Sequence, residues 1–290
     1  MNPGRLGVWY AADKLSPGEW AQFITSAESL GYETLWYSES RGFESMALGS
    51  YLLCNSSKII VGSSIANIYA RDAVASRAGM QTLSAISGDR FVLGLGVSHV
   101  PLVESFRGHA YGKPLSTMRA YLEHMMAGAE NAGTWPLVLA ALGPRMLELA
   151  AELTRGAVPY NVTPEHTARA KTILGPDKWL AVEQKVCLES DATTARQLAR
   201  NELERYLGLE NYRNCWRSLG FGTDDFEGGG SDRFLDAMVV WGSVDTIKSR
   251  LAEHFDAGAT HVCIQPVHRA GDLGAALRVL EALAPGQAGT

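Results

Sequence analysis

The stretch that decides the fold is Lys58-Ile-Ile-Val-Gly-Ser-Ser-Ile-Ala-Asn-Ile-Tyr-Ala-Arg-Asp72. It opens with adjacent β-branched residues, which are typical of a short parallel strand covered on both faces. Gly62, Ser63 and Ser64 then interrupt the strand, and an extended pattern resumes from Ile65. Small residues inside a strand indicate a bulge or a close backbone approach by a ligand.

The residues that follow complete one βαβ unit. Asp72 is placed to cap a helix that runs to about Ser87, and Gly88 is placed to end it. The next strand runs to Leu95 and leads into Gly-Val-Ser-His99. Because α/β folds carry their sites at the carboxyl ends of parallel strands, the small residues and the histidine mark a candidate site.

The same alternation of strand and helix extends over the whole chain. Ser16-Pro-Gly-Glu19 and Thr163-Pro-Glu165 each have the form of a helix start. Eight alternating units with parallel-type strands predict one domain, residues 1–290, folded as a (β/α)8 TIM barrel. The expected strands are Leu6–Tyr10, Thr34–Tyr37, Ile59–Ser63, Phe91–Leu95, Leu137–Ala140, Ala157–Tyr160, Leu180–Leu188 and His261–Gln265.

Two segments exceed the minimal barrel. The connection 96–117 is long and rich in Gly, Pro and His, and long loops inside compact domains are usually functional or disordered. Residues 207–231 form an excursion before the last strand, which we interpret as a lid or a helical insertion. Within it, 211–219 has a helical pattern and 223–230 has the character of a mobile acidic loop.

Composition excludes several classes of protein. The chain has 290 residues, 46% of them hydrophobic, and a net charge of −5. It contains no basic stripe and no long apolar run, so nucleic acid and membrane are not expected partners. Four scattered cysteines without a Cys-x-x-Cys pair predict reduced thiols in a cytoplasmic protein.

Motif searching excludes other enzymes. Gly94-Leu-Gly-Val-Ser-His99 lacks the third glycine of a dinucleotide fingerprint, and the chain has no Walker motif, no Gly-x-Ser-x-Gly elbow and no His-Glu-x-x-His helix. We therefore expect no metal site. Lys185 has the type of a Schiff-base residue, but pairing with Glu183 on one strand face is the stronger interpretation.

Several of the quoted segments together resemble the luciferase-like family of flavin- and deazaflavin-dependent oxidoreductases, and in particular an actinobacterial branch that uses coenzyme F420. The resemblance spans nearly the whole chain in the expected order. It rests on 61–71, 88–99, Arg107-Gly-His-Ala-Tyr-Gly-Lys-Pro114, Leu139-Ala-Ala-Leu-Gly-Pro-Arg-Met146, Pro159-Tyr-Asn-Val-Thr-Pro-Glu-His166 and Ala257-Gly-Ala-Thr-His-Val-Cys-Ile-Gln265.

The resemblance implies a set of cofactor-binding residues. In the family, the bulge after the third strand lies behind the central ring and contains a non-prolyl cis peptide, which by position is Ser64–Ile65. The turn that opens the helix at Pro144 holds the cofactor phosphate. The cofactor-binding residues expected on this basis are Ser63, Ser64, Ile65, Asn67, Gly96, Ser98, Gly143, Pro144, Arg145 and Met146. The alternatives are an ordinary Gly-Ser turn and an ordinary surface arginine.

Two residues are candidates for catalysis. Glu39 follows the second strand, where a carboxylate can serve in acid–base work or can simply be solvated. Sugar-phosphate dehydrogenases of the family have a histidine after the matching acid, whereas this chain has Ser40. His99 is the candidate for the missing proton donor.

The expected activity is hydride transfer between F420 and a small organic molecule, by a homodimer. An FMN-dependent monooxygenase that uses molecular oxygen is the alternative enzyme, and a non-catalytic flavin-binding protein is the alternative outside catalysis.

Overall fold

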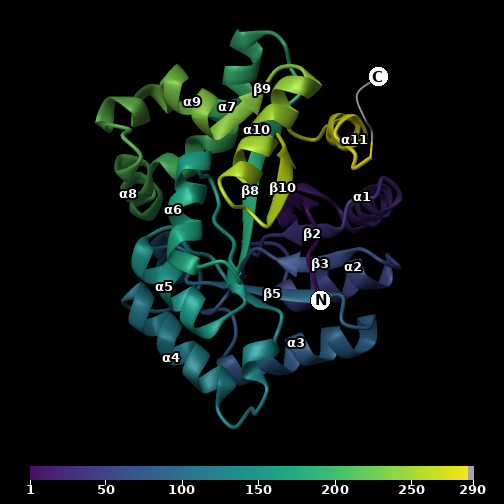
Figure 1. Cartoon of the computed structure of the whole chain (residues 1–290), viewed down its shortest axis with the longest axis vertical. Coiled ribbons are helices and arrows are strands. Elements are labelled where there is room, and N and C mark those ends of the chain that lie inside the picture. The colour runs from purple at the N-terminus through teal and green to yellow at the C-terminus, as the bar shows by residue number, and fades with distance from the viewer. Residues whose placement is uncertain (287–290) are drawn as a thin grey trace.

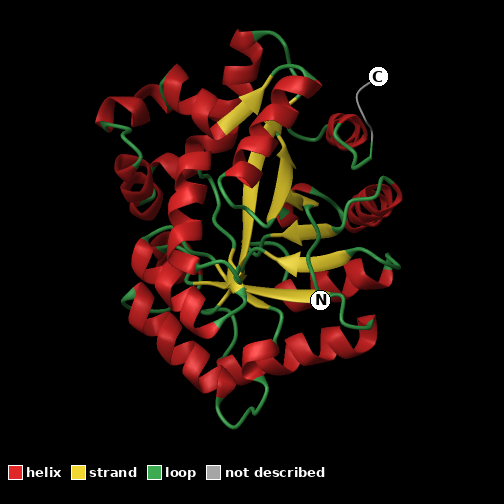
Figure 2. Cartoon of the chain, in the orientation of Figure 1, coloured by secondary structure: helices red, strands yellow, loops and turns green. Residues whose placement is uncertain are grey.

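Eight parallel strands close into a barrel in the computed structural model, which describes residues 1–286. Neighbouring strands follow the order of the chain, and the last strand pairs with both the first and the seventh, which closes the ring. Helices surround the strands (Figure 2). The predicted TIM barrel is confirmed. Its strands are β1 (Leu6–Tyr10), β2 (Thr34–Tyr37), β3 (Ile60–Ser63), β5 (Phe91–Gly96), β6 (Leu137–Leu139), β7 (Gly156–Ala157), β8 (Trp179–Cys187) and β10 (His261–Pro266).

The helices begin where the sequence places their caps. Ser16 and Glu19 form a capping box at the start of α1, and the Asp72 carboxylate accepts a hydrogen bond of 2.7 Å from Ala75 N at the start of α3. Gly88 ends α3 with a left-handed φ of 67°. The α-helices are α1 (Pro17–Ser29), α2 (Ser45–Cys54), α3 (Ala73–Ser87), α4 (Pro114–Met126), α5 (Pro144–Leu153), α6 (Pro164–Leu174), α7 (Ala192–Leu207), α8 (Glu210–Ser218), α9 (Asp232–Met238), α10 (Val244–Asp256) and α11 (Leu273–Ala282).

Two short strands were not in the expected set. β4 (Ala66–Asn67) pairs with β5 directly after the interruption of β3. β9 (Val239–Trp241) pairs with β8 from Lys185 onward, on the side opposite β10. The expected strand Ala157–Tyr160 is shorter in the structure, because only β7 (Gly156–Ala157) is in the ladder.

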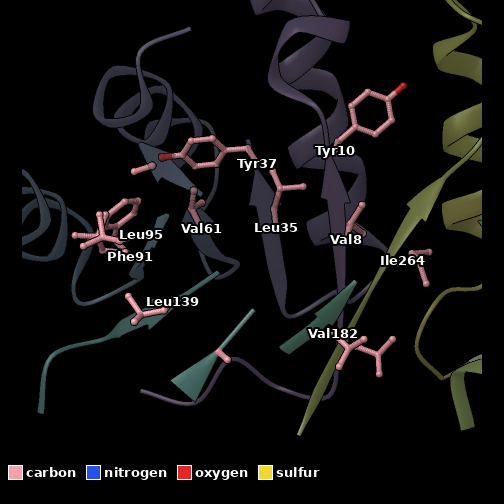
Figure 3. Packing of buried hydrophobic residues seen from close by; sticks show 14 of the residues in the cluster. Val8, Tyr10, Leu35, Tyr37, Val61, Phe91, Leu95, Leu139, Val182 and Ile264 are labelled. Atoms are coloured by element: carbon pink, nitrogen blue, oxygen red, sulfur yellow. The ribbon is translucent and has the colours of Figure 1, made fainter. Parts of the chain in front are cut away.

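Alternate residues of the strands face two separate cores. Side chains on the outer face of the barrel pack against the helices, and Figure 3 shows Val8, Leu35 and Val61 of this layer on adjacent strands. The inner face carries a smaller cluster that includes Trp9 and Trp36. Burial on both faces explains why the strands read as nearly continuous apolar runs.

On the inner face, two large side chains pack against glycine residues of neighbouring strands. Trp36 Nε1 donates a hydrogen bond of 3.0 Å to His261 Nε2 inside the barrel. A Cβ atom on Gly62 would lie 2.4 Å from the Trp36 ring, and one on Gly7 would lie 2.6 Å from the His261 ring. Two glycines therefore provide the room for this indole–imidazole pair.

The excursion before the last strand is helical. Figure 1 shows α8 and α9, in green, gathered at one edge of the molecule. The helix expected at 211–219 is α8. The segment expected as an acidic loop, 223–230, instead forms the 3₁₀ element η4 (Thr223–Gly229), because Asp225 is buried and accepts hydrogen bonds from Ser231 Oγ at 2.6 Å and Gly222 N at 2.8 Å. Among residues 1–286, no helix has the length and apolar character that crossing a bilayer requires.

Candidate functional site at the barrel mouth

The carboxyl ends of the strands, called the mouth below, gather the residues expected to act. Glu39 lies two residues beyond β2, Ser64 directly follows β3, and His99 lies three residues beyond β5. Gly143 follows β6 and caps α5. The prediction that these four residues share the carboxyl face of one barrel is confirmed. Their roles in binding or catalysis stay predictions.

The bulge after β3 has the expected backbone geometry, since the Ser64–Ile65 peptide is cis. The Ser63 hydroxyl donates to Gly94 O at 2.9 Å and accepts from Gly94 N at 3.0 Å, which ties the bulge to β5. A Cβ on Gly96 would lie 2.4 Å from Ile65 Cγ1. Gly96 therefore lets Ile65 pack directly on the strand, where its partly buried side chain forms an apolar wall.

Glu39 is held by a buried ion pair. Its side chain is 2% exposed, and both oxygens accept hydrogen bonds from the Arg71 guanidinium. The same carboxylate accepts from Asn67 N at 2.7 Å and from Ser45 N at 3.2 Å. Because its acceptor positions are taken, this geometry favours Glu39 as an anchor of the rim over Glu39 as a free acid–base group.

Asn67 takes part in the same anchor. Its side-chain oxygen accepts a hydrogen bond of 2.9 Å from Tyr69 N, and the residue is 3% exposed. Sequence reasoning considered Asn67 as a contact to the ring and missed its link to Glu39 and Arg71. The spacing from Glu39 to Arg71 carries no local signal, because the pair joins the ends of two different βα units.

His99 belongs to the loop after β5 and contacts the insertion. Its ring lies 5.7 Å from the Tyr212 ring, centroid to centroid, and it is hydrogen-bonded to the Asn211 side chain. Burial lowers the pKa of His99, and the hydrogen bond to Asn211 opposes that shift in part. Ser98, beside it, has a left-handed φ of 56°, and its carbonyl accepts from Tyr111 Oη at 3.2 Å.

The turn expected to bind phosphate is open to solvent. Gly143, Pro144 and Arg145 are exposed, and a Cβ on Gly143 would meet nothing within 4 Å. Pro144 stands at the first position of α5, so the amides of the turn lie at a helix N-terminus, where anions bind favourably. Met146 is half-buried at the end of the turn. His166 Nε2 is 2.8 Å from Leu142 O and supports this turn from below.

A buried polar cluster fills the β7–β8–β10 side of the mouth. Lys185 Nζ donates to Asn161 Oδ1 at 2.6 Å, to Glu183 Oε1 at 3.2 Å and to Gln265 Oε1 at 3.3 Å. It also lies 3.8 Å from the centroid of the Tyr160 ring. Burial lowers the pKa of Lys185 and raises the pKa of Glu183, and their mutual attraction opposes both shifts.

This cluster confirms the expected pairing of Lys185 with Glu183. With three acceptors for its three N–H groups, the ammonium is bound within the protein. Asn161 and Gln265 were not predicted as partners, because they lie near the ends of strands that are far apart in the chain.

Aromatic side chains of the insertion continue the cluster outward. Tyr212 of α8 packs near Tyr206 of α7 and Tyr160, with ring centroids 5.3 Å and 6.4 Å away. Trp216 of α8 stacks on Tyr212 at 5.6 Å and donates from Nε1 to Asn161 O at 3.0 Å. Helix α8 therefore covers one side of the mouth, as a lid would.

Two cavities lie outside the mouth. One of about 680 Å³ is at the opposite end of the barrel, where Trp135, Arg155 and Trp179 line it. The other, of about 580 Å³, lies between the loop after β4 and α4, and His109 lines it together with Arg71. His109 therefore faces a neighbouring groove, whereas the candidate site is the mouth itself.

Solved structures with this architecture include one with F420 and one with FMN. "F420-dependent secondary alcohol dehydrogenase in complex with an F420-acetone adduct" has a TM-score of 0.77 at 12% identity and covers 98% of this chain and 99% of its own. The FMN-bound oxygenating constituent of 3,6-diketocamphane monooxygenase, from the CAM plasmid of Pseudomonas putida, has a TM-score of 0.70 at 15% identity and covers 97% of both chains. Both structures are similar in fold alone.

Sequence similarity leads to one family. "Putative coenzyme F420-dependent oxidoreductase Rv3520c" of Mycobacterium tuberculosis (strain ATCC 25618 / H37Rv) is 22% identical in an alignment of 326 positions, gaps included. The alignment covers 90% of this chain and 93% of that protein. Residues 1–261 match the profile of the family described as Luciferase-like monooxygenase. The chain belongs to this luciferase-like family of oxidoreductases.

Proposed function

We propose that the protein transfers a hydride between the deazaflavin coenzyme F420 and a small organic substrate at the barrel mouth. The observation that carries the proposal is the wall built at the bulge. Gly96 allows Ile65 to lie flat against β5, and the Ser63 hydroxyl fixes the strand behind it. A planar ring needs such an apolar surface against one face, so that only the other face meets the substrate.

The residues of the mouth suit the cofactor in two places. Ile65, which packs on Gly96, presents a partly buried apolar side chain that would support one face of a ring on the β3–β5 side of the mouth. The exposed amides at Gly143 to Met146, with the Arg145 guanidinium, suit a phosphate on the cofactor tail. F420, when bound, supplies hydride chemistry with little reactivity toward oxygen.

The remaining residues would orient the reactants and exclude water. The Glu39–Arg71 pair holds the rim after β2 to the loop after β4. Helix α8 shields the mouth with Tyr212 and Trp216. Burial lowers the pKa of His99 and so favours its neutral ring, and we propose His99, in contact with α8, as the group that accepts a proton from the substrate when the substrate is oxidised.

F420 is proposed over FMN because the resemblance around residues 65–71 and 107–114 points to the F420-using branch, and the mycobacterial relative has F420 in its name. An FMN-dependent monooxygenase is the second candidate, since an FMN-bound oxygenase shares the fold. We also propose that the protein acts as a homodimer in the cytoplasm, and sedimentation analysis tests the oligomeric state.

Titration of the apo-protein with F420 and with FMN tests the choice of cofactor. Trp9 lies at the base of the mouth and donates from Nε1 to Ser64 O at 3.3 Å, so its fluorescence should respond to a bound ring. We expect tighter binding of F420. Micromolar affinity for FMN without any response to F420 would overturn the proposal. Reduction of bound cofactor without any product would favour a non-catalytic binding protein.

A further inference from the structure

One donor in the buried cluster has no acceptor. Asn161 is 2% exposed, directly after Tyr160 on the turn that follows β7, and its side-chain Nδ2 is a buried nitrogen without a hydrogen-bond partner. Buried polar groups in native proteins are nearly always paired, so an unpaired donor at a candidate site needs an explanation. One explanation is a ligand that supplies the missing hydrogen-bond acceptor.

The orientation of the Asn161 amide is fixed by its neighbours. Its Oδ1 accepts the hydrogen bond of 2.6 Å from Lys185 Nζ, and a flipped amide would point its NH₂ group at an ammonium. Its backbone N donates to Glu183 Oε2 at 3.2 Å, and its backbone O accepts from Trp216 Nε1 at 3.0 Å. Every other polar group of the residue is therefore engaged, and Nδ2 alone is left to bind something else.

The residue before Asn161 links this turn to the wall proposed to hold the ring. Tyr160 packs on Trp9 with ring centroids 4.8 Å apart, and Trp9 donates to Ser64 O in the bulge. The rings of Tyr160 and Trp9 therefore join the turn that carries Asn161 to the bulge. Helix α8 packs against the same turn, because Trp216 Nε1 donates to the Asn161 backbone oxygen.

We propose that Asn161 is a substrate-binding residue whose Nδ2 donates a hydrogen bond to a carbonyl or carboxylate oxygen of the substrate. Lys185 is the positioning residue, because it holds Oδ1 and so presents Nδ2. The inference rests on the proposed function in that it places the substrate opposite the ring. The proposed substrate class is therefore a compound with a carbonyl or carboxylate oxygen that accepts a hydrogen bond.

The variant of choice follows from the backbone. Asn161 has a left-handed φ of 57°, which Asn and Asp tolerate better than other residues with a side chain. Asn161→Asp keeps the shape and the acceptor for Lys185, replaces the NH₂ donor by an oxygen and adds one negative charge. Asn214→Asp is the matched control, since Asn214 is exposed on α8 and its change adds the same charge.

Benzoate and benzamide serve as probes of the two kinds of oxygen acceptor, charged and neutral. Their dissociation constants are measured by tryptophan fluorescence for the wild-type protein and both variants. We expect at least one probe to bind the wild type, and Asn161→Asp to weaken it about tenfold, the loss typical of one hydrogen bond to a charged or buried group. Asn214→Asp should bind it like the wild type.

A second readout does not depend on a variant that folds. In ¹H–¹⁵N spectra of the wild type, the Asn161 side-chain NH₂ signal should shift when the probe is added. Equal binding by Asn161→Asp, an unmoved NH₂ signal, or no binding of either probe would overturn the proposal. F420 and FMN titrations of the same samples separate the outcomes, because loss of cofactor binding with intact probe binding contradicts only the proposed function.

Discussion

Gly94→Ala and Gly96→Ala should separate stability from ligand binding. A Cβ on Gly94 would lie 2.1 Å from Ser63 O, a backbone atom, whereas a Cβ on Gly96 would meet the side chain of Ile65 at 2.4 Å. Backbone in a strand cannot yield without moving the strand. A side chain can turn away, in this case toward the mouth.

The loss of stability expected for Gly94→Ala follows from the contacts that break when β3 moves away from β5. Overpacking a buried site costs about 1–3 kcal/mol. Moving β3 from β5 also breaks the two hydrogen bonds of the Ser63 hydroxyl to Gly94, each worth about 0.5–1.5 kcal/mol. We therefore expect a loss of about 2–6 kcal/mol in the free energy of unfolding. At about 2–4 °C per kcal/mol, the Tm should fall by about 4–24 °C.

Gly96→Ala should lose less stability and more affinity. Urea denaturation gives the free energies, and fluorescence titration with F420 gives the affinity. Gly18→Ala is the control, because Gly18 lies in the first turn of α1 with open space around it and should be neutral or slightly stabilising. If Gly94→Ala cost less than about 1 kcal/mol while Gly96→Ala unfolded the protein, the reasoning from these contacts would be refuted.

Three further predictions concern charge. Arg145→Ala should weaken F420 binding by about 1–3 kcal/mol, the range for a charged hydrogen bond, and an affinity unchanged over a range of salt would make Arg145 an ordinary surface residue. Arg71→Met should lower the free energy of unfolding by about 3–5 kcal/mol in urea, because it leaves Glu39 buried without its partner; a loss under about 1 kcal/mol would contradict the buried pair. Burial lowers the pKa of His254 to about 3 and of His261 to about 4. Below pH 6.5 these two histidines therefore bind protons in the unfolded chain but stay neutral in the folded protein. Stability should fall by up to about 1.4 kcal/mol per pH unit for each histidine between pH 6 and pH 5, and less steeply for His261 as the pH approaches 4. The slope in His254→Gln should be smaller by one such contribution.

Much of the fold was predictable because its signals are local. The capping box of α1 and the Asp72 and Gly88 ends of α3 lie where the sequence places them. β9 was missed because its three residues follow α9 without a turn signal. The strand 157–160 was predicted too long because periodicity cannot show which residues have a ladder partner.

The site was predictable in position but less so in contacts. The carboxyl-end rule placed Glu39 and His99 at the mouth, and the cis peptide at Ser64–Ile65 was expected from the family resemblance rather than from any physical signal in the sequence. Glu183 was expected as a partner of Lys185, but Arg71 as the partner of Glu39 and Asn161 and Gln265 as further partners of Lys185 were not. Each of these comes from a different βα unit, and only closure of the barrel brings them together.

The indole–imidazole pair inside the barrel has a consequence for divergence. Trp36, His261 and the two glycines opposite them, Gly7 and Gly62, form one size-complementary set contributed by four strands. A larger residue at position 62 is compatible only with a smaller one at position 36, whereas a Cβ at position 7 would also lie 2.6 Å from the backbone oxygen of Thr34. In relatives of this chain, positions 36 and 62 should therefore vary together while position 7 stays glycine, and a library that randomises position 62 alone should yield few folded members.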